Sequence, residues 1–163
     1  MNNYDRLRSK IIDTPTAKLL VNQWKKQGER VVFTNGCFDL IHLGHIDYLA
    51  HASMLGNRLI IGLNTDRSVK RLKGRTRPVQ DEFARAMVLS SIFFVDAVVL
   101  FEEDTPLEII KELVPDILVK GSDYEIHQIV GADVVIANGG SVETIDFVEG
   151  YSTTAIINKL KKD

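Results

Sequence analysis

Two histidines, His42 and His45, flank Gly44 where an apolar, strand-like run gives way to a helical pattern. A glycine at this point lets a large ligand approach the backbone, and the first turn of a helix offers unpaired N–H groups to an anion. Two imidazoles beside such a cradle can donate hydrogen bonds to phosphate oxygens as negative charge builds up on them. The spacing therefore predicts a phosphate site in which His42 and His45 stabilise charge.

Other interpretations of these residues stay open on the residue pattern alone. A histidine pair could hold a metal ion, although Asp39 is the only nearby candidate for a third ligand. Both histidines could instead be structural. Cys37 and a histidine could form a nucleophile pair, but a lone cysteine is more often a small buried apolar residue. We predict no resident metal ion and no catalytic thiol.

A run of basic residues follows the second apolar run, and it consists of Lys70, Arg71, Lys73, Arg75 and Arg77. We interpret it as a mobile loop that closes on a triphosphate and neutralises the departing pyrophosphate. A solvated surface loop is the alternative. On the following predicted helix, Arg85 could reach a phosphate, or it could pair with Asp81 or Glu82 at helical spacing.

Three hydroxyl residues, Ser152, Thr153 and Thr154, open the last predicted helix. They could cap that helix or hold a phosphate against its N-terminus, and the two roles are compatible. Each of them is therefore a candidate ligand for an anion.

Four further residues have types that invite a functional interpretation. Lys120 is a candidate phosphate ligand, with a buried or paired lysine as the alternative. We interpret His51 and His127 as ordinary surface or helix residues. Trp24 is expected to pack the leading helix onto the sheet rather than to stack on a base.

Apolar runs alternate with helical patterns along the chain, which predicts a parallel sheet covered by helices on both faces. Because the runs are continuous, most of the strands are expected to be buried on both sides. Strands are predicted at 31–34, 59–63, 98–101, 117–119 and 134–136, with an edge strand at 142–147. Helices are predicted at 15–26, 44–55, 81–93 and 152–162, and one more begins at 105–108 with Thr105 as its cap and Pro106 as its first residue. The predicted fold is a doubly wound, Rossmann-like α/β domain, whose ligands bind at the carboxyl ends of the strands.

Composition limits the classes of protein that fit. The 163 residues (18.3 kDa) carry 20 Lys and Arg against 22 Asp and Glu, a net charge of −2, and no general nucleic-acid binder is expected from that balance. A single cysteine favours a reducing compartment, and no apolar run approaches the roughly 18 residues that span a membrane. We expect a cytoplasmic protein with an N-terminal helical extension (1–29) and one catalytic domain (30–163).

The residues Gly36-x-Phe38-Asp39-x-x-His42-x-Gly44-His45 resemble the signature of the nucleotidyltransferases that carry an H-x-G-H motif. Further segments narrow the resemblance to the adenylyltransferases that form ADP-heptose, and they are 64–66, 69–74, 77–79, 101–106, 119–124, 137–140 and 149–154. In many bacteria that enzyme is fused to a heptose-phosphate kinase. No kinase domain occurs in this sequence, so the resemblance implies a stand-alone form.

The resemblance implies transfer of AMP from ATP, with Mg²⁺, to D-glycero-β-D-manno-heptose 1-phosphate. The expected partners are ATP, the sugar 1-phosphate and further copies of the chain in a homo-oligomer, without nucleic acid or membrane. The implied catalytic residues are His42, His45 and Lys73. The implied nucleotide-binding residues are Thr34, Asn35, Gly36, Cys37, Phe38, Gly44, Asn64, Arg85, Ser152, Thr153 and Thr154. The implied substrate-binding residues are Asp39, Asp66, Arg77, Lys120, Asp123 and Tyr124.

Two departures bear on specificity. The related glycerol-3-phosphate cytidylyltransferases carry Arg-Thr before Glu-Gly-x-Ser-Thr-Thr, where this chain has Phe147-Val148, and this favours the ADP-heptose branch. Ser122 replaces a glycine that is usual in the heptose enzymes, so a restricted backbone is expected there. The alternatives are a cytidylyltransferase for glycerol 3-phosphate or another polyol phosphate, and a nucleotide-binding module without turnover.

Overall fold

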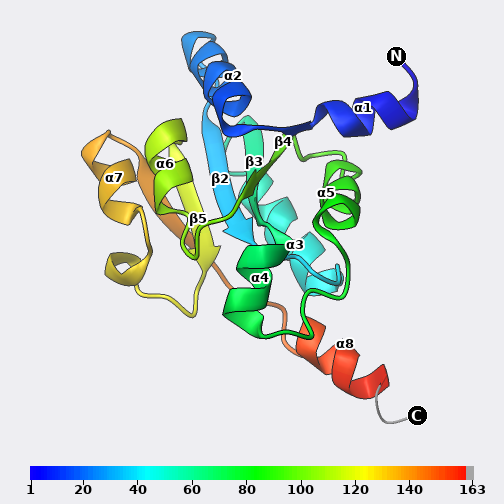
Figure 1. The fold of residues 1–163 in the computed structure, drawn as a ribbon. Helices are drawn as coiled ribbons and strands as arrows, with labels where there is room; N and C mark the ends of the chain where they lie inside the picture. Colours follow the sequence, from blue (N-terminus) through cyan, green and yellow to red (C-terminus); the bar gives the residue numbers. More distant parts are fainter. Residues whose placement is uncertain (161–163) are drawn as a thin grey trace.

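A six-stranded parallel sheet forms the centre of this computed structural model, which describes residues 1–160 (Figure 1). The strands lie side by side in the order β1-β4-β3-β2-β5-β6. Their bounds are Ile11–Ile12 (β1), Val31–Gly36 (β2), Arg58–Asn64 (β3), Ala97–Phe101 (β4), Ile117–Gly121 (β5) and Ser141–Ile145 (β6). Since β2 lies between β3 and β5 and the strands are parallel, the segments that follow these three strands lie side by side at the carboxyl end of the sheet.

Helices cover both faces of the sheet (Figure 1). Their bounds are Asn3–Ser9 (α1), Thr14–Lys26 (α2), Leu43–Ser53 (α3), Asp66–Lys73 (α4), Glu82–Ser90 (α5), Leu107–Leu113 (α6), Ala132–Ala137 (α7) and Thr153–Leu160 (α8), with a 3-10 turn at Ile126–Gln128. Buried residues of α2, α6 and α7 pack in one apolar cluster, and those of α3 and α5 pack in a second. No helix within residues 1–160 is long and apolar enough to cross a membrane.

The central strand explains why two apolar layers form. Val31 and Phe33 of β2 belong to the cluster under α2 and α6, whereas Val32 belongs to the cluster under α3 and α5. Successive side chains of a strand point to opposite faces, so a continuous apolar run supplies both cores at once. This confirms the predicted doubly wound α/β fold, and Trp24 packs against the first cluster as predicted.

The predicted strand at 134–136 is wrong, because these residues belong to helix α7. Ala132 and Val135 are buried, while Ile136 is 54% exposed. Burial at a spacing of three residues is helical, so packing of one face against the core overrides the preference of β-branched residues for strands. The predicted edge strand is confirmed as β6.

The basic segment is also organised differently from its prediction as a loop. Lys70, Arg71 and Lys73 lie on helix α4, which begins where the Thr65 side chain accepts a hydrogen bond from the Ser68 N–H. Ser68 and Val69 are buried, and this anchors one side of the helix. The prediction treated the run of charge as a mobile loop and missed the helix cap at Thr65. Only residues 74–81 connect α4 to α5 without regular structure.

Smaller differences occur at other elements. Pro106, not Thr105, occupies the N-cap of α6, so the predicted threonine cap is wrong. Helix α1 and strand β1 were not predicted, and β1 pairs with β4 at the edge of the sheet. The division of the chain at residue 30 stays a prediction. The last predicted helix is confirmed as α8 up to Leu160, and residues 161 and 162 of that prediction lie outside the described residues.

Candidate active site

The histidine pair lies at the beginning of α3, directly beyond the end of β2. His42 occupies the N-cap, and its ring stacks on that of His45 with a centroid separation of 3.8 Å. Phe38 packs its own ring 5.2 Å from the His45 ring, and the Phe38 backbone has a φ of 43°, in the left-handed region that non-glycine residues rarely adopt. Backbone strain of this kind persists only where the surrounding structure fixes the conformation, and it is often found at functional sites.

Both rings present a nitrogen that is buried but unpaired. Within residues 1–160, Nδ1 of His42 and Nδ1 of His45 have no hydrogen-bond partner. Burial lowers the pKa of both rings, and for His45 burial together with the neighbouring His42 lowers the pKa to about 4. The His45 ring is therefore neutral near pH 7. Buried polar atoms without a partner are rare in proteins, so these nitrogens single out the pair as a candidate site.

A cavity of about 590 Å³ opens beside this pair. It is lined by His45 together with most of the other predicted site residues, namely Asn35, Gly36, Cys37, Phe38, Asp39, Asn64, Lys73, Arg77, Lys120, Asp123, Tyr124, Thr153 and Thr154. Six predicted residues are absent from the lining, namely Thr34, His42, Gly44, Asp66, Arg85 and Ser152. The carboxyl ends of β2, β3 and β5, together with the beginning of α8, thus bring together residues that are up to 119 positions apart in the chain.

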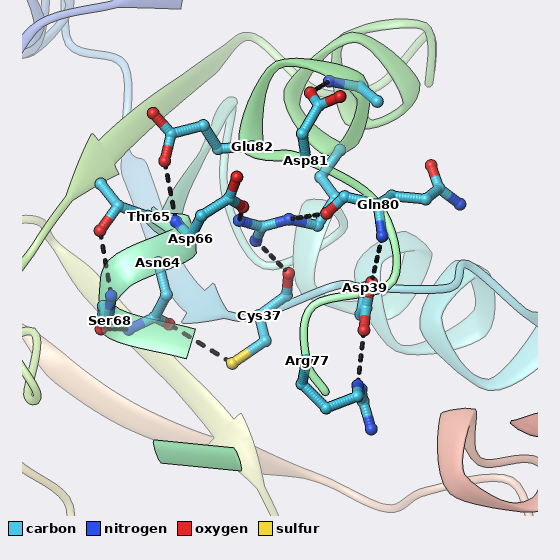
Figure 2. A network of polar contacts seen from close by, with 12 residues as sticks. Cys37, Asp39, Asn64, Thr65, Asp66, Ser68, Arg77, Gln80, Asp81 and Glu82 are labelled. Carbon is cyan, nitrogen blue, oxygen red and sulfur yellow. Dashed lines mark hydrogen bonds and ion pairs between the residues drawn. The ribbon is translucent and has the colours of Figure 1, made fainter. Parts of the chain in front are cut away.

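Asp39 anchors the segment between α4 and α5 (Figure 2). Its carboxylate is almost fully buried and accepts hydrogen bonds from Arg77 Nε at 2.6 Å and from the backbone N–H groups of Val79 and Gln80. Although burial opposes ionisation, these hydrogen bonds and the Arg77 charge hold the Asp39 pKa below its usual value. A carboxylate satisfied in this way has little capacity left for a substrate, so its geometry is that of an anchor.

Arg85 organises a second buried connection. Its side chain has no exposed surface, and its guanidinium donates to the Cys37 carbonyl at 2.7 Å, the Gln80 carbonyl at 3.1 Å and Asp66 Oδ1 at 2.7 Å. Neither alternative predicted for Arg85, a phosphate or an ion pair with Asp81 or Glu82, matches these contacts. Its geometry, like that of Asp66, is that of a positioning residue.

Cys37 is held as a thiol. Burial raises the pKa of its Sγ group, despite opposing effects of Lys73, Arg85 and Arg77. Its Sγ lies 4.0 Å from the amide oxygen of Asn64, whose Nδ2 in turn donates to Ser68 Oγ at 2.9 Å (Figure 2). A neutral thiol is a poor nucleophile, so this environment is unfavourable to catalysis by sulfur.

Lys120 and Asp123 lie on the β5 side of the cavity. Burial lowers the pKa of Lys120 to about 8, and the Asp123 carboxylate opposes this shift. Near pH 7 the ammonium group is still largely charged and suits a phosphate. Ser122, between them, donates its backbone N–H to the Ile145 carbonyl. Among the described residues, a positive φ outside glycine occurs only at Phe38 and Val114, so Ser122 does not adopt the left-handed conformation that a glycine would allow, and the effect of a serine here stays a prediction.

The hydroxyl residues combine capping with access to the cavity. Ser152 Oγ accepts a hydrogen bond from the Ala155 N–H at 3.0 Å, as a helix cap does, whereas Thr153 and Thr154 line the cavity. Thr153 Oγ1 also donates to the Leu40 carbonyl at 3.3 Å, which links α8 to the segment between β2 and α3.

Comparison with known proteins decides the family. The model of the cytidylyltransferase-like family matches residues 33–159, which is most of the chain and includes the histidine pair. The chain belongs to the cytidylyltransferase-like family. This membership makes it a nucleotidyltransferase, an enzyme that transfers a nucleotidyl group.

Relatives of this cytidylyltransferase-like chain include the bifunctional protein HldE of Azorhizobium caulinodans, which is 54% identical over 151 residues, and that of Campylobacter jejuni subsp. jejuni serotype O:6, which is 56% identical over 142 residues. These matches cover 93% and 87% of this chain but only 32% and 30% of the relatives, so the chain spans about a third of their length. A solved structure of a lipopolysaccharide core biosynthesis protein from Thermoplasma volcanium is 30% identical, with a TM-score of 0.59, and the match covers 77% of this chain and all of that one.

The cavity is also lined by residues that were not predicted from the sequence as site residues. They are Tyr48, Leu72, Asp104, Thr105, Pro106, Gly121, Gln128, Ile129, Val130 and Phe147. Most of them lie on segments that follow β4, β5 and β6, where no pattern of residue types marks a site. Segments 101–106 and 119–124 carried part of the family resemblance and the Phe147-Val148 departure was used for specificity, but none of these signals was used to place these residues in the site.

The site offers no ready-made metal cluster. Within residues 1–160, no group of three or more His, Cys, Asp or Glu side chains is arranged to hold an ion. Asp39 is satisfied by Arg77 and backbone N–H groups, and Asp104 pairs with Arg71. The donor set fits a Mg²⁺ ion that enters bound to the oxygens of a triphosphate, because Mg²⁺ commonly uses substrate phosphates as ligands.

Proposed function

We propose that this chain transfers AMP from Mg·ATP to D-glycero-β-D-manno-heptose 1-phosphate and releases pyrophosphate. An anionic oxygen of the sugar phosphate attacks the α-phosphorus of ATP, and the bond from that phosphorus to the bridging oxygen of the β-phosphate breaks. The sugar phosphate supplies its own nucleophile, so the reaction needs neither a protein nucleophile nor a protein base. Catalysis then depends on alignment of the reactants and on stabilisation of charge.

The observation that carries this proposal is the stacked pair of imidazoles whose Nδ1 atoms are buried and unpartnered at the first turn of α3. Backbone N–H groups at a helix N-terminus favour an anion, and imidazole nitrogens can donate to phosphate oxygens that gain charge in the transition state. In this proposal His42 and His45 act on the α-phosphate, and Lys73 neutralises the pyrophosphate as it leaves.

The remaining predicted residues take two kinds of role. Residues that line the cavity are proposed to contact ligands: the glycine-containing segment 35–38, Asn64, Thr153 and Thr154 the nucleotide, and Lys120, Asp123 and Tyr124 the sugar phosphate. Asp39, Asp66 and Arg85 are proposed to position these segments, because their polar atoms already bind protein groups.

ATP and a heptose phosphate are favoured over other substrates by the motif resemblance, above all by Phe147-Val148 in place of Arg-Thr. The relatives named HldE match along nearly the whole of this chain, and one neighbour of known structure is a lipopolysaccharide core biosynthesis protein. Both findings support an acceptor that belongs to surface-glycan precursors.

Pyrophosphate release tests the proposal. Mg·ATP with D-glycero-β-D-manno-heptose 1-phosphate is assayed beside Mg·CTP with glycerol 3-phosphate, and each nucleotide is also assayed without an acceptor. Rapid release is expected only from ATP with the heptose phosphate. Release only from CTP with glycerol 3-phosphate would assign the chain to the cytidylyltransferase alternative. No release from either pair, with ATP still bound, would contradict turnover of these substrates and favour the binding module.

A further inference from the structure

Phe147 has an unusual position for an aromatic residue outside the regular elements. It follows β6, and its ring stacks on the Tyr48 ring of α3 with a centroid separation of 5.8 Å and an interplanar angle of 26°. The Tyr48 hydroxyl in turn lies 2.8 Å from Oγ1 of Thr34, which is fully buried in β2. The phenyl ring of Phe147 therefore rests on a partner that is itself fixed to the central strand.

The end of β5 holds the same ring from another side. A Cβ atom added to Gly121 would lie 2.2 Å from both Cε2 and Cζ of Phe147. No side chain fits at that distance, so the glycine provides the space that the phenyl ring occupies. Two elements, α3 and β5, thus determine where the ring lies.

The ring nevertheless keeps an open surface. Phe147 is 54% exposed and lines the site cavity, and it also lines a second cavity of about 550 Å³ beside α3 and β6. Met54, Leu55, Ile145 and Val148 contribute to that second cavity. The phenyl ring therefore forms part of the wall between the two spaces.

The cavity is chemically divided. Charged or polar groups of His45, Lys73, Arg77, Lys120 and Asp123 line it, whereas the Phe147 ring offers an apolar face. An exposed aromatic face in a polar cavity matches a planar ring, and every nucleobase offers such a face. A purine has the larger face and gains more from stacking than a pyrimidine.

We propose that Phe147 is a specificity-determining residue that stacks on the base of the bound nucleotide and favours adenine over cytosine. This inference rests on the proposed function in that it takes ATP as the donor. Tyr48 and Gly121 act through Phe147 as positioning residues, because they fix the plane of its ring without needing to touch the base.

The test compares dissociation constants for Mg·ATP, Mg·CTP, inorganic tripolyphosphate with Mg²⁺ and D-glycero-β-D-manno-heptose 1-phosphate, measured by calorimetry on the full chain. Phe147→Leu keeps an apolar wall but removes the aromatic plane, and it is expected to weaken ATP about tenfold. Tripolyphosphate, which has no base, should bind within twofold of the unmodified protein, and the preference for ATP over CTP should shrink. Phe147→Tyr keeps the ring and should retain ATP affinity. Phe93→Leu, at a phenylalanine that is 91% exposed and outside the cavity, is the matched control.

Three results would overturn the inference. Phe147→Leu could weaken the binding of ATP and of tripolyphosphate equally, or Phe147→Tyr could weaken ATP binding as much as Phe147→Leu does. Phe147→Leu could also leave the affinity for ATP unchanged and weaken the binding of the heptose phosphate. The last result would mean that the ring stacks on the sugar. Because binding needs no turnover, the measurement decides the inference even if the pyrophosphate assay contradicts the proposed acceptor.

Discussion

The segment after β2 and the segment after β6 both reach the cavity, but they are held in opposite ways. The first is tied down by buried polar groups, with Asp39 and Arg85 each bonded to three protein groups. The second leads into α8, of whose residues 153–160 none is buried, and Thr153 links that helix to the Leu40 carbonyl.

The difference separates two requirements of group transfer. Groups that stabilise charge in a transition state work best when they are fixed before the substrate arrives. Elements that admit and release substrates come from weakly held parts of a structure. The histidine pair belongs to the first kind of segment and the α8 hydroxyl groups to the second.

The largest expected effect concerns the fixed side. His45→Ala should lower kcat/KM for pyrophosphate release by about 10²–10³, because a preorganised donor to the α-phosphate is lost. His51→Ala is the matched control, since His51 lies on the same helix with an exposed side chain that pairs with Asp47, and it should leave the rate within twofold. A folded His45→Ala protein that keeps more than a tenth of the rate would contradict the proposed role.

Arg85→Ala should lower the free energy of unfolding by about 3 kcal/mol in a denaturant titration, because the Cys37 carbonyl and the Asp66 carboxylate lose their hydrogen-bond donor. The comparison variant is Arg67→Ala, which removes an exposed ion pair with Glu102 and should have a much smaller effect. Similar losses for the two arginines would show that the fixed side is not held by its buried network.

Lys120, on the β5 side of the cavity, should make binding of the sugar phosphate depend on pH. Its pKa is lowered to about 8, so the charged form that attracts phosphate predominates at pH 7 and is lost as the pH rises through 8. KM for the sugar phosphate should therefore rise about tenfold between pH 7 and pH 9. Lys120→Met should have a high KM with little dependence on pH. An unchanged pH profile in that variant would exclude Lys120 as the titrating group.

The smallest effect is expected on the weakly held side. Thr153→Val removes the hydrogen bond to the Leu40 carbonyl, which is worth about 1 kcal/mol, but α8 buries nothing that would transmit the loss. Amide hydrogen exchange in α8 should accelerate while the global unfolding free energy stays nearly constant. A global loss above about 1 kcal/mol would mean that α8 is part of the cooperative core.

The sequence was informative where one pattern had one physical cause. The continuous run at 31–34 predicted a strand buried on both faces, and the motif after it marked the cavity through Gly36 and His45. At 134–136 and 70–73 the same kind of reasoning failed, because one-sided burial of α7 and the Thr65 cap of α4 outweighed residue preference and charge. These are tertiary effects that no local window contains.

The candidate site was predictable in its members more than in their roles. The family resemblance assigned Asp39, Asp66 and Arg85 to ligands, yet their protein partners lie up to 48 positions away along the chain, at Arg77, Arg85 and Cys37. Tyr48 escaped notice because an aromatic residue at helical spacing is ordinary, and Phe147 was used for specificity but not placed in the cavity, because an aromatic residue after an edge strand is also ordinary. Only the fold brings their rings together over Gly121.

That contact predicts how positions 121 and 147 can change together in evolution. Alanine at position 121 collides with a phenyl ring at position 147, so either change alone is penalised, whereas Gly121→Ala combined with Phe147→Leu relieves the collision. Related sequences should therefore gain a side chain at the first position chiefly when they lose the ring at the second. Such linked substitutions would mark the branches of the family in which the choice of nucleotide has shifted.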